Sequence, residues 1–308
     1  MKILITGGLG HIGSYILQNI NKIKILKTIY VIDNLSTQRY TSLFNQPKSN
    51  KKIYFLNLDL AEKNSLKKFK KVDVVINLAS ITDAEASLKM KKKVFKNNLG
   101  IFKNVMQYCI KNSSKLIHIS STSIYGKQIN IVDENCEKKF LKPQSPYAKV
   151  KLIEEEMLKR NSKKIKYTTF RFGTIAGVSK GIRFHTAVNK FCFNASFDKP
   201  IGVYKTALHQ YRPYLSIKDS FKVFKFCIEK DFFKNEIFNA LSGNYTVNQI
   251  LKKIGKYKKD IKVKLVNSAI MNQLSYHVSS KKLESNGLFL KGNIENDIKK
   301  ALKLLSNI

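Results

Sequence analysis

A glycine-rich turn after the first apolar run is the feature of this sequence that most limits its fold. Residues Lys2–Thr6 read as a buried strand, and a segment with helical spacing follows the turn. Glycines three residues apart permit a tight turn, close approach of the backbone to a pyrophosphate, and close packing of helix on strand. The pattern predicts a β-α unit that holds a dinucleotide at its helix N-terminus, with cofactor contacts from Gly7, Gly10, His11, Ile12 and Gly13.

A carboxylate ends the next apolar run. Asp33 closes the segment Thr28–Asp33 and lies twenty residues beyond Gly13, where an acidic side chain hydrogen-bonds the ribose hydroxyls of a bound dinucleotide. Its charge would repel a 2′-phosphate, so the sequence favours NAD over NADP. We expect the neighbouring Asn34 to contact the cofactor as well. The alternative is an ordinary β-α turn that Asp33 merely caps.

Apolar, β-branched runs alternate with helical segments through the first half of the chain. The runs lack in/out alternation, which is typical of strands buried on both faces of a parallel sheet. The order predicts an α/β, Rossmann-type doubly wound parallel sheet. We expect strands over Lys2–Thr6, Thr28–Asp33, 52–59, 72–79, Lys115–Ser121 and 166–172, and helices over 12–21, 65–71, Lys91–Asn112 and 146–161.

The pattern changes after residue 172, where glycine, proline and aromatic residues separate shorter elements. We therefore expect an NAD-binding domain over 1–172. A smaller substrate-binding region over 173–308 should cover the carboxyl edge of the sheet and return some elements to it.

The net charge of +36 raises the possibility of a nucleic-acid partner. However, 52 of the 57 basic residues are lysines, whereas phosphate and base recognition favours the arginine fork. Lysine, asparagine, isoleucine, tyrosine and phenylalanine share A/T-rich codons, so composition bias on a solvated surface is the simpler explanation. We expect no nucleic-acid partner.

The four cysteines are far apart and form no metal-type pair, so we predict free thiols, a reducing cytoplasmic location and no metal. A strand beginning at residue 2 leaves no room for a secretion signal. No apolar run reaches the roughly 18 residues that a membrane span requires.

Several motifs follow one another in a fixed order along the chain: Thr6–Gly13, Asp33–Ser36, Asp59-Leu60, Leu78–Ser80, Asn97 with Gly100, Ser120–Gly126, Ser145–Lys151 and Arg212–Tyr214. Together they resemble the extended short-chain dehydrogenase/reductases of the NAD-dependent nucleotide-sugar epimerase/dehydratase family. The resemblance covers nearly all of the chain and implies a nucleotide-sugar substrate and a homodimer. It also implies further cofactor contacts from Asp59, Leu60, Leu78, Ala79, Ser80 and Asn97, where the alternatives are a strand-ending Asp59 and a helix-surface Asn97.

Tyr147 and Lys151 are the proposed catalytic pair and also contact the cofactor. Positions i and i+4 share a helix face, so the ammonium can favour the phenolate that takes a hydroxyl proton during hydride transfer. In a chain with 52 lysines this spacing also arises by chance. The serine loop after the fifth strand strengthens the prediction, and the resemblance places the catalytic hydroxyl at Ser121, which would also contact substrate.

The resemblance also bears on reaction and substrate. Dehydratases of the family carry an Asp-Glu pair where this chain has Thr122-Ser123, so we expect 4-epimerisation of a UDP-sugar through a transient 4-keto intermediate. A 4-ketoreductase or dehydrogenase uses the same catalytic set, and a non-catalytic scaffold with a basic surface for RNA or an acidic partner is the third alternative. The implied substrate contacts are Thr174, Asn189 and Arg212. Thr174 replaces the usual asparagine, and the late arginine of the 4-epimerases has no counterpart in 268–274.

Overall fold

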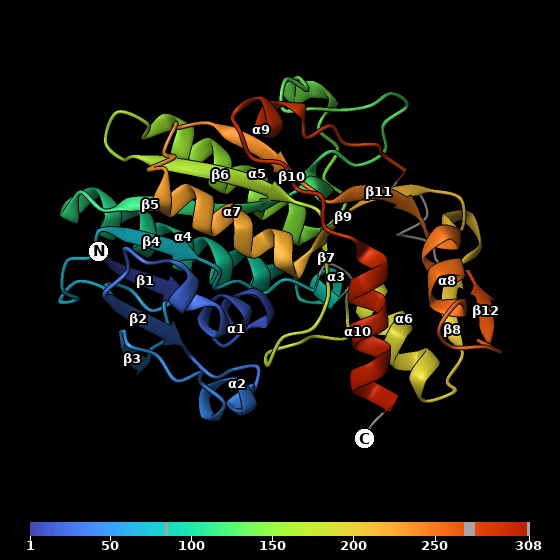
Figure 1. The fold of residues 1–308 in the computed structure, drawn as a ribbon. Helices are drawn as coiled ribbons and strands as arrows, with labels where there is room; N and C mark the ends of the chain where they lie inside the picture. Colours follow the sequence, from blue (N-terminus) through green and yellow to red (C-terminus); the bar gives the residue numbers. More distant parts are fainter. Residues whose placement is uncertain (84–85, 268–274, 307–308) are drawn as a thin grey trace.

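A seven-stranded parallel sheet forms the centre of the computed structural model, which describes residues 1–83, 86–267 and 275–306 (Figure 1). The strand order β10-β6-β5-β4-β1-β2-β3 and the parallel pairing confirm the predicted Rossmann-type doubly wound sheet. The strands are β1 (Lys2–Thr6), β2 (Thr28–Asp33), β3 (Lys52–Asn57), β4 (Val74–Asn77), β5 (Lys115–Ser121), β6 (Tyr167–Phe172) and β10 (Ile237–Ala240).

Helices cover both faces of this sheet, as Figure 1 shows. Helices α1 (His11–Gln18) and α7 (Ile217–Glu229) contribute to the hydrophobic core on one face. Helices α4 (Lys91–Asn112) and α5 (Pro146–Arg160) contribute to the core on the other. Successive residues of β1 enter different cores, and this is why the central strands show no polar alternation.

A second region lies beside the carboxyl edge of the sheet and has a hydrophobic core of its own. Helix α7 and strand β10 return to the first region, so the division at residue 172 stays a prediction. The elements of the second region are β7 (Thr174–Ala176), α6 (Ala187–Ser196), β8 (Ile201–Tyr204), β9 (Tyr211–Ser216), β11 (Gly243–Thr246), α8 (Val247–Gly255), β12 (Val263–Val266) and α10 (Ile294–Ser306). The described chain also has three short α-helices, α2 (Tyr40–Phe44), α3 (Ala86–Lys89) and α9 (Lys281–Ser285), and four single-turn 3₁₀ helices.

One predicted helix is wrong. Residues 63–68 form consecutive turns, and 69–71 have no regular structure. Asn64 has a left-handed φ of 60°, and the backbone hydrogen bonds join residues three apart. Leu66 is buried in the core and Phe69 packs against the same cluster, so these turns bury their apolar side chains without a helix. The strands predicted over 52–59 and 72–79 also end early, at Asn57 and Asn77, because the residues that follow leave the sheet and line a cavity.

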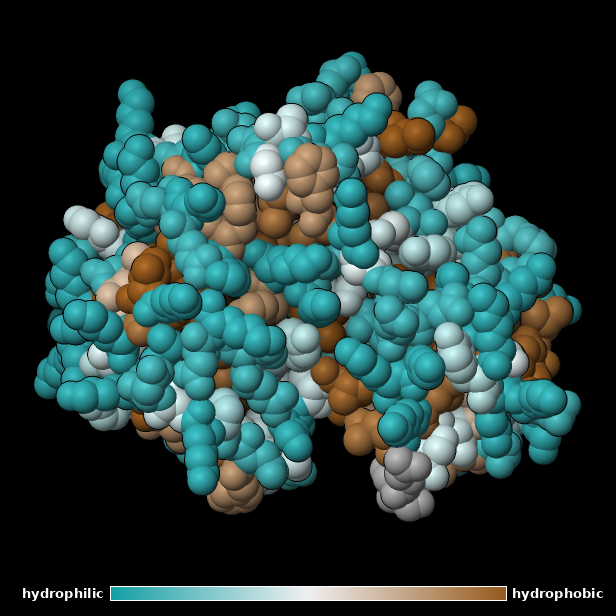
Figure 2. Space-filling model, in the orientation of Figure 1, coloured by the Kyte–Doolittle hydropathy of each residue, from teal (hydrophilic) through white to brown (hydrophobic). Residues whose placement is uncertain are grey.

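Hydrophilic side chains cover most of the face seen in Figure 2. Among the described residues, no helix is both long and apolar enough to cross a membrane. The segment 268–274, where the sequence lacks the late arginine, lies outside the described residues.

Candidate active site

The glycine turn lies at the carboxyl end of β1, and its geometry leaves no room for side chains. Gly7 has a φ of 63°, and a Cβ there would lie 2.8 Å from the backbone of Ala79. A Cβ on Gly13 would lie 2.6 Å from Gly8. Gly10 is the extended N-cap of α1 and makes no side-chain cap, so the first N–H groups of the helix remain available to a phosphate.

Asp33 is held rigidly at the end of β2. One carboxylate oxygen accepts a hydrogen bond from the Leu9 backbone N–H at 3.1 Å, and the other accepts one from the Leu35 N–H at 3.0 Å. Burial lowers the pKa of the nearby Arg39, and the charge of Asp33 opposes this lowering. The carboxylate is thus fixed beside the glycine turn, where the ribose contact was predicted.

The loop after β4 is held by polar contacts that the sequence only partly predicts. The Thr6 hydroxyl donates to Asn77 at 2.7 Å and accepts from the backbone N–H groups of Leu78 and Ala79. Asn98 makes both hydrogen bonds to the Ile81 backbone, at 2.8 and 3.0 Å. Asn98 is buried on α4 and holds this loop, a contact that the sequence did not predict, while the cofactor contact of Asn97 stays a prediction.

These elements enclose one cavity of about 910 Å³. The fit to a dinucleotide is good, since the open helix N-terminus, the fixed carboxylate and the loop after β4 all face it. Every cofactor contact predicted from the sequence lines this cavity: Gly7, Gly10, His11, Ile12, Gly13, Asp33, Asn34, Asp59, Leu60, Leu78, Ala79, Ser80, Asn97, Tyr147 and Lys151.

Helix α5 begins with the predicted catalytic pair. The Ser145 hydroxyl caps the helix by accepting from the Ala148 N–H at 3.1 Å, and a proline follows at the first helical position. The ammonium of Lys151 lies 5.8 Å from the centre of the Tyr147 ring, and both residues line the cavity. Lys149, on the same helix, is exposed to solvent.

Lys151 is only 3% exposed, and its Nζ donates to Glu154 Oε2 at 2.8 Å. Burial opposes the charge of the lysine, but the charge and hydrogen bond of Glu154, together with Tyr147 and Glu155, outweigh burial and raise the pKa of Lys151 above its ordinary value. The lysine is therefore a permanent cation beside the tyrosine at neutral pH.

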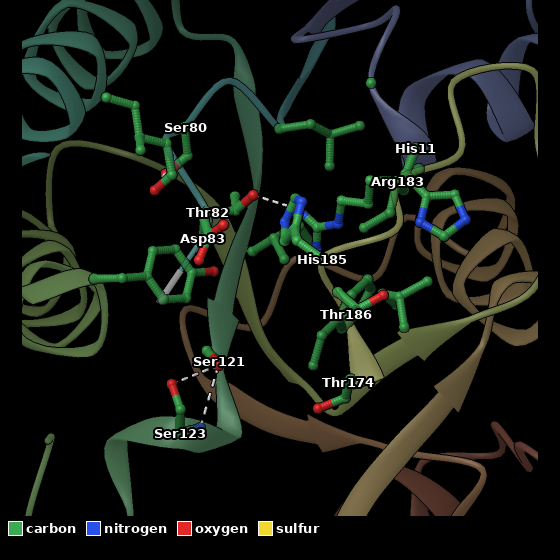
Figure 3. Close-up of a pocket in the computed structure, with 18 of the residues that line it drawn as sticks. His11, Ser80, Thr82, Asp83, Ser121, Ser123, Thr174, Arg183, His185 and Thr186 are labelled. Atoms are coloured by element: carbon green, nitrogen blue, oxygen red, sulfur yellow. Dashed lines mark hydrogen bonds between the residues drawn. The ribbon is translucent and has the colours of Figure 1, made fainter. Parts of the chain in front are cut away.

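Ser121 ends β5, and its side chain lies in the serine loop shown in Figure 3. Its Oγ accepts the Ser123 N–H at 3.2 Å and lies 2.8 Å from the Ser123 Oγ. Thr122 points away and donates to the Phe172 carbonyl at 3.2 Å. The loop thus holds the Ser121 and Ser123 hydroxyls together at the cavity, and neither Thr122 nor Ser123 supplies the carboxyl group that a dehydratase pair would require.

The predicted substrate contacts divide into two groups. Thr174 and Arg212 line the cavity, and the Nε and one Nη of Arg212 are buried without a hydrogen-bond partner among the described residues. Asn189 does not line it; this side chain accepts from the Gly177 N–H at 3.1 Å and donates to the Arg183 carbonyl at 3.2 Å. Asn189 thus supports this segment, and the substrate contact implied for it stays a prediction.

Two of the scarce arginines have different tasks. Arg171 is 3% exposed and makes a two-point pair with Glu155, with distances of 3.0 and 2.7 Å, so its planar fork is used inside the protein. Arg183 lines the cavity, donates to the Thr82 hydroxyl and lies near Asp83 (Figure 3). The scarcity of arginine in this lysine-rich chain is the only feature of the sequence that points to Arg183.

His11 fastens the second region to the glycine turn. Its Nε2 donates to the Gly177 carbonyl at 2.9 Å, and burial lowers its pKa to about 3, which keeps the ring neutral. Nearby, the Ser14 hydroxyl accepts from the Gly181 N–H at 2.9 Å. These two hydrogen bonds hold the segment that carries Arg183 against the glycine turn. His11 therefore has a structural role in addition to lining the cavity.

An open parallel sheet with a glycine turn, a carboxylate fixed beside that turn and a large cavity at its carboxyl edge defines a dinucleotide-binding protein of the Rossmann type. The chain belongs to the NAD dependent epimerase/dehydratase family, whose model matches residues 3–240. It is therefore an enzyme of a nucleotide-sugar epimerase/dehydratase family, and its cofactor is NAD, as predicted.

Two curated relatives illustrate the similarity. The chain is 27% identical over 258 residues to a putative UDP-glucose 4-epimerase of Methanocaldococcus jannaschii, covering 80% of this chain and 79% of that protein. It is 29% identical over 164 residues to the UDP-glucose 4-epimerase of Yersinia enterocolitica, where the match covers 52% of this chain and 48% of that protein. The second match thus spans about half of the length of that relative.

A solved structure shares the fold over the whole chain. The UDP-N-acetylglucosamine 4-epimerase of Methanobrevibacter ruminantium, in complex with UDP-N-acetylmuramic acid, has a TM-score of 0.86 at 24% identity, covering 100% of this chain and 99% of that one. This likeness shows the fold.

Proposed function

We propose that this chain is an NAD-dependent nucleotide-sugar epimerase that inverts C4 of a UDP-sugar through a transient 4-keto sugar, and that it acts as a cytoplasmic homodimer. One observation carries the proposal: Tyr147, Lys151 and Ser121, from two different elements, line the same cavity as the glycine turn and Asp33. The UDP-glucose 4-epimerases among the relatives support the choice of reaction and nucleotide.

The three side chains have complementary roles. Tyr147 takes the proton of the sugar C4 hydroxyl and later returns it to the same oxygen. Lys151 stabilises the phenolate that this requires, and Ser121 donates a hydrogen bond to the reacting oxygen. When bound, NAD supplies the acceptor for the C4 hydride and the donor that returns it.

Inversion requires the keto sugar to present its opposite face, which in turn requires room and an anchor elsewhere on the substrate. The cavity of about 910 Å³ provides the room. Arg212, with two unpartnered guanidinium nitrogens among the described residues, is the proposed anchor for the diphosphate. Arg183 and Thr174 face the same space and complete the proposed substrate wall.

A panel of UDP-, GDP-, CDP- and dTDP-sugars, incubated with the purified protein with and without added NAD, tests the proposal. Product chromatography detects the sugars, and absorbance at the NADH band detects the reduced cofactor. The expected result is interconversion of UDP-sugar 4-epimers without net NADH formation. Stoichiometric NADH consumption or formation would instead identify a ketoreductase or dehydrogenase. Loss of water from the sugar would identify a dehydratase and contradict the role assigned to the serine loop.

A further inference from the structure

A buried group of ionisable side chains lies directly behind Lys151, and the reaction proposed above does not use it. Glu154 is 1% exposed and His118 is fully buried. Glu154 Oε2 lies 2.8 Å from the Lys151 ammonium and 3.6 Å from His118 Nε2. Burying a carboxylate costs several kcal/mol unless it is paired, so this group requires an explanation.

Burial raises the pKa of Glu154, and the Lys151 ammonium at 2.8 Å opposes that rise, so Lys151 and not His118 is the counter-charge of this carboxylate. Burial, with a further contribution from Lys151, lowers the pKa of His118 well below its ordinary value, so the ring is neutral near pH 7. Glu155, the next residue of α5, is already paired with Arg171. The buried side chains of α4, all within the described part of the chain, include no Asp, Glu, Lys, Arg or His.

We propose that Glu154 is a positioning residue: it holds the Lys151 ammonium and reduces the positive field that this ammonium exerts on Tyr147. The proposal rests on the proposed catalytic role of Tyr147. Seen from the phenol, an ion pair with a 2.8 Å separation acts as a dipole, and a dipole exerts a weaker field than a single charge. Glu154 thereby sets the pH range in which Tyr147 can take a proton.

The direction of the effect follows from the charges. In Glu154→Gln the ammonium acts on Tyr147 without its counter-charge, so the phenolate becomes more stable. The acid-side midpoint of the pH–kcat/KM profile is therefore expected to move to lower pH, by about 0.5 to 1 unit at an effective dielectric constant near 20. A side chain that only filled space behind Lys151 would change kcat or the melting temperature and leave this midpoint in place.

The experiment compares Glu154→Gln with Glu156→Gln, which removes a charge from the same helix at a side chain that is 30% exposed. The first variant should shift the midpoint downward and the second should not. Glu154→Asp covers the case in which the Gln variant fails to fold: its carboxylate is one methylene farther from Lys151, so a smaller downward shift is expected. An unshifted midpoint in a folded Glu154 variant would overturn the proposal.

A second measurement separates this proposal from the proposed function. The ionisation of the Tyr147 phenol is followed by ultraviolet absorbance, as the difference between each protein and the same protein carrying Tyr147→Phe. The Glu154 variants should lower the pH midpoint of that ionisation whether or not the protein turns over a sugar. If Tyr147→Phe keeps full turnover, the catalytic role fails, while this titration still decides the effect of Glu154.

Discussion

The Lys151 ammonium lies 5.8 Å from the centre of the Tyr147 ring and donates a hydrogen bond of 2.8 Å to Glu154 Oε2. The i, i+4 spacing alone is common in a chain with so many lysines. What distinguishes this pair is burial, because Lys151 is 3% exposed and lines the cavity beside the glycine turn.

Removal of the Tyr147 hydroxyl tests its proposed role. Tyr147→Phe is expected to bind NAD normally and to lose turnover by about 10²- to 10⁴-fold, the usual contribution of a general acid–base group. Tyr257→Phe, at a tyrosine that is 42% exposed, serves as the control and should keep full turnover. Steady-state kinetics and an NAD titration check both variants, and a fully active Tyr147→Phe enzyme would refute the assignment.

Asp33 is expected to set the preference for NAD. Asp33→Asn removes the charge that repels a 2′-phosphate and leaves the nearby cation Arg39 unopposed. The affinity ratio of NADP to NAD should therefore rise by about tenfold, which corresponds to about 1.4 kcal/mol. Calorimetric titration with both dinucleotides measures the ratio.

The double variant Asp33→Asn with Arg39→Gln is the control for this prediction, and most of the gain in NADP affinity should disappear from it. If the ratio is unchanged in the single variant, Asp33 only caps the turn through its bonds to Leu9 and Leu35.

The buried pair of Arg171 and Glu155 should dominate the local stability of α5 against β6. Arg171→Leu leaves the Glu155 carboxylate buried without its partner, which is expected to lower the free energy of unfolding by about 3 to 5 kcal/mol. Lys115→Met breaks a pair whose side chains are 37% and 63% exposed, and should cost less than about 1 kcal/mol. Urea unfolding of both variants gives the comparison, and equal losses would show that the buried pair has no special role.

Local sequence pattern was sufficient for much of the fold and of the cofactor site. The bounds of Lys2–Thr6, Thr28–Asp33 and Lys115–Ser121 agree with the structure, because continuous β-branched runs between turn residues have few alternatives. The glycines and Asp33, which the sequence predicts as cofactor contacts, likewise line one cavity, since a β-α unit is itself a local structure.

The polar residues were harder to assign, because the direction in which a polar side chain points depends on partners far away in the sequence. Asn98 and not Asn97 holds the loop after β4, and Asn189 supports Arg183 instead of facing the cavity. The predicted helix over 65–71 failed for a related reason: long-range burial of Leu66 outweighed its local preference.

Helix α5 shows both what the local sequence predicts and what only the tertiary structure decides. Its sequence already places Tyr147 and Lys151 on one helix face, which follows from the helical period alone. Only the folded chain shows that Lys151 is buried against Glu154 and His118, and that Arg171 is used within the protein while Arg183 reaches the cavity. The reason is physical: the charge state and availability of a side chain depend on burial and on nearby charges, and both come from segments that meet only in the tertiary structure.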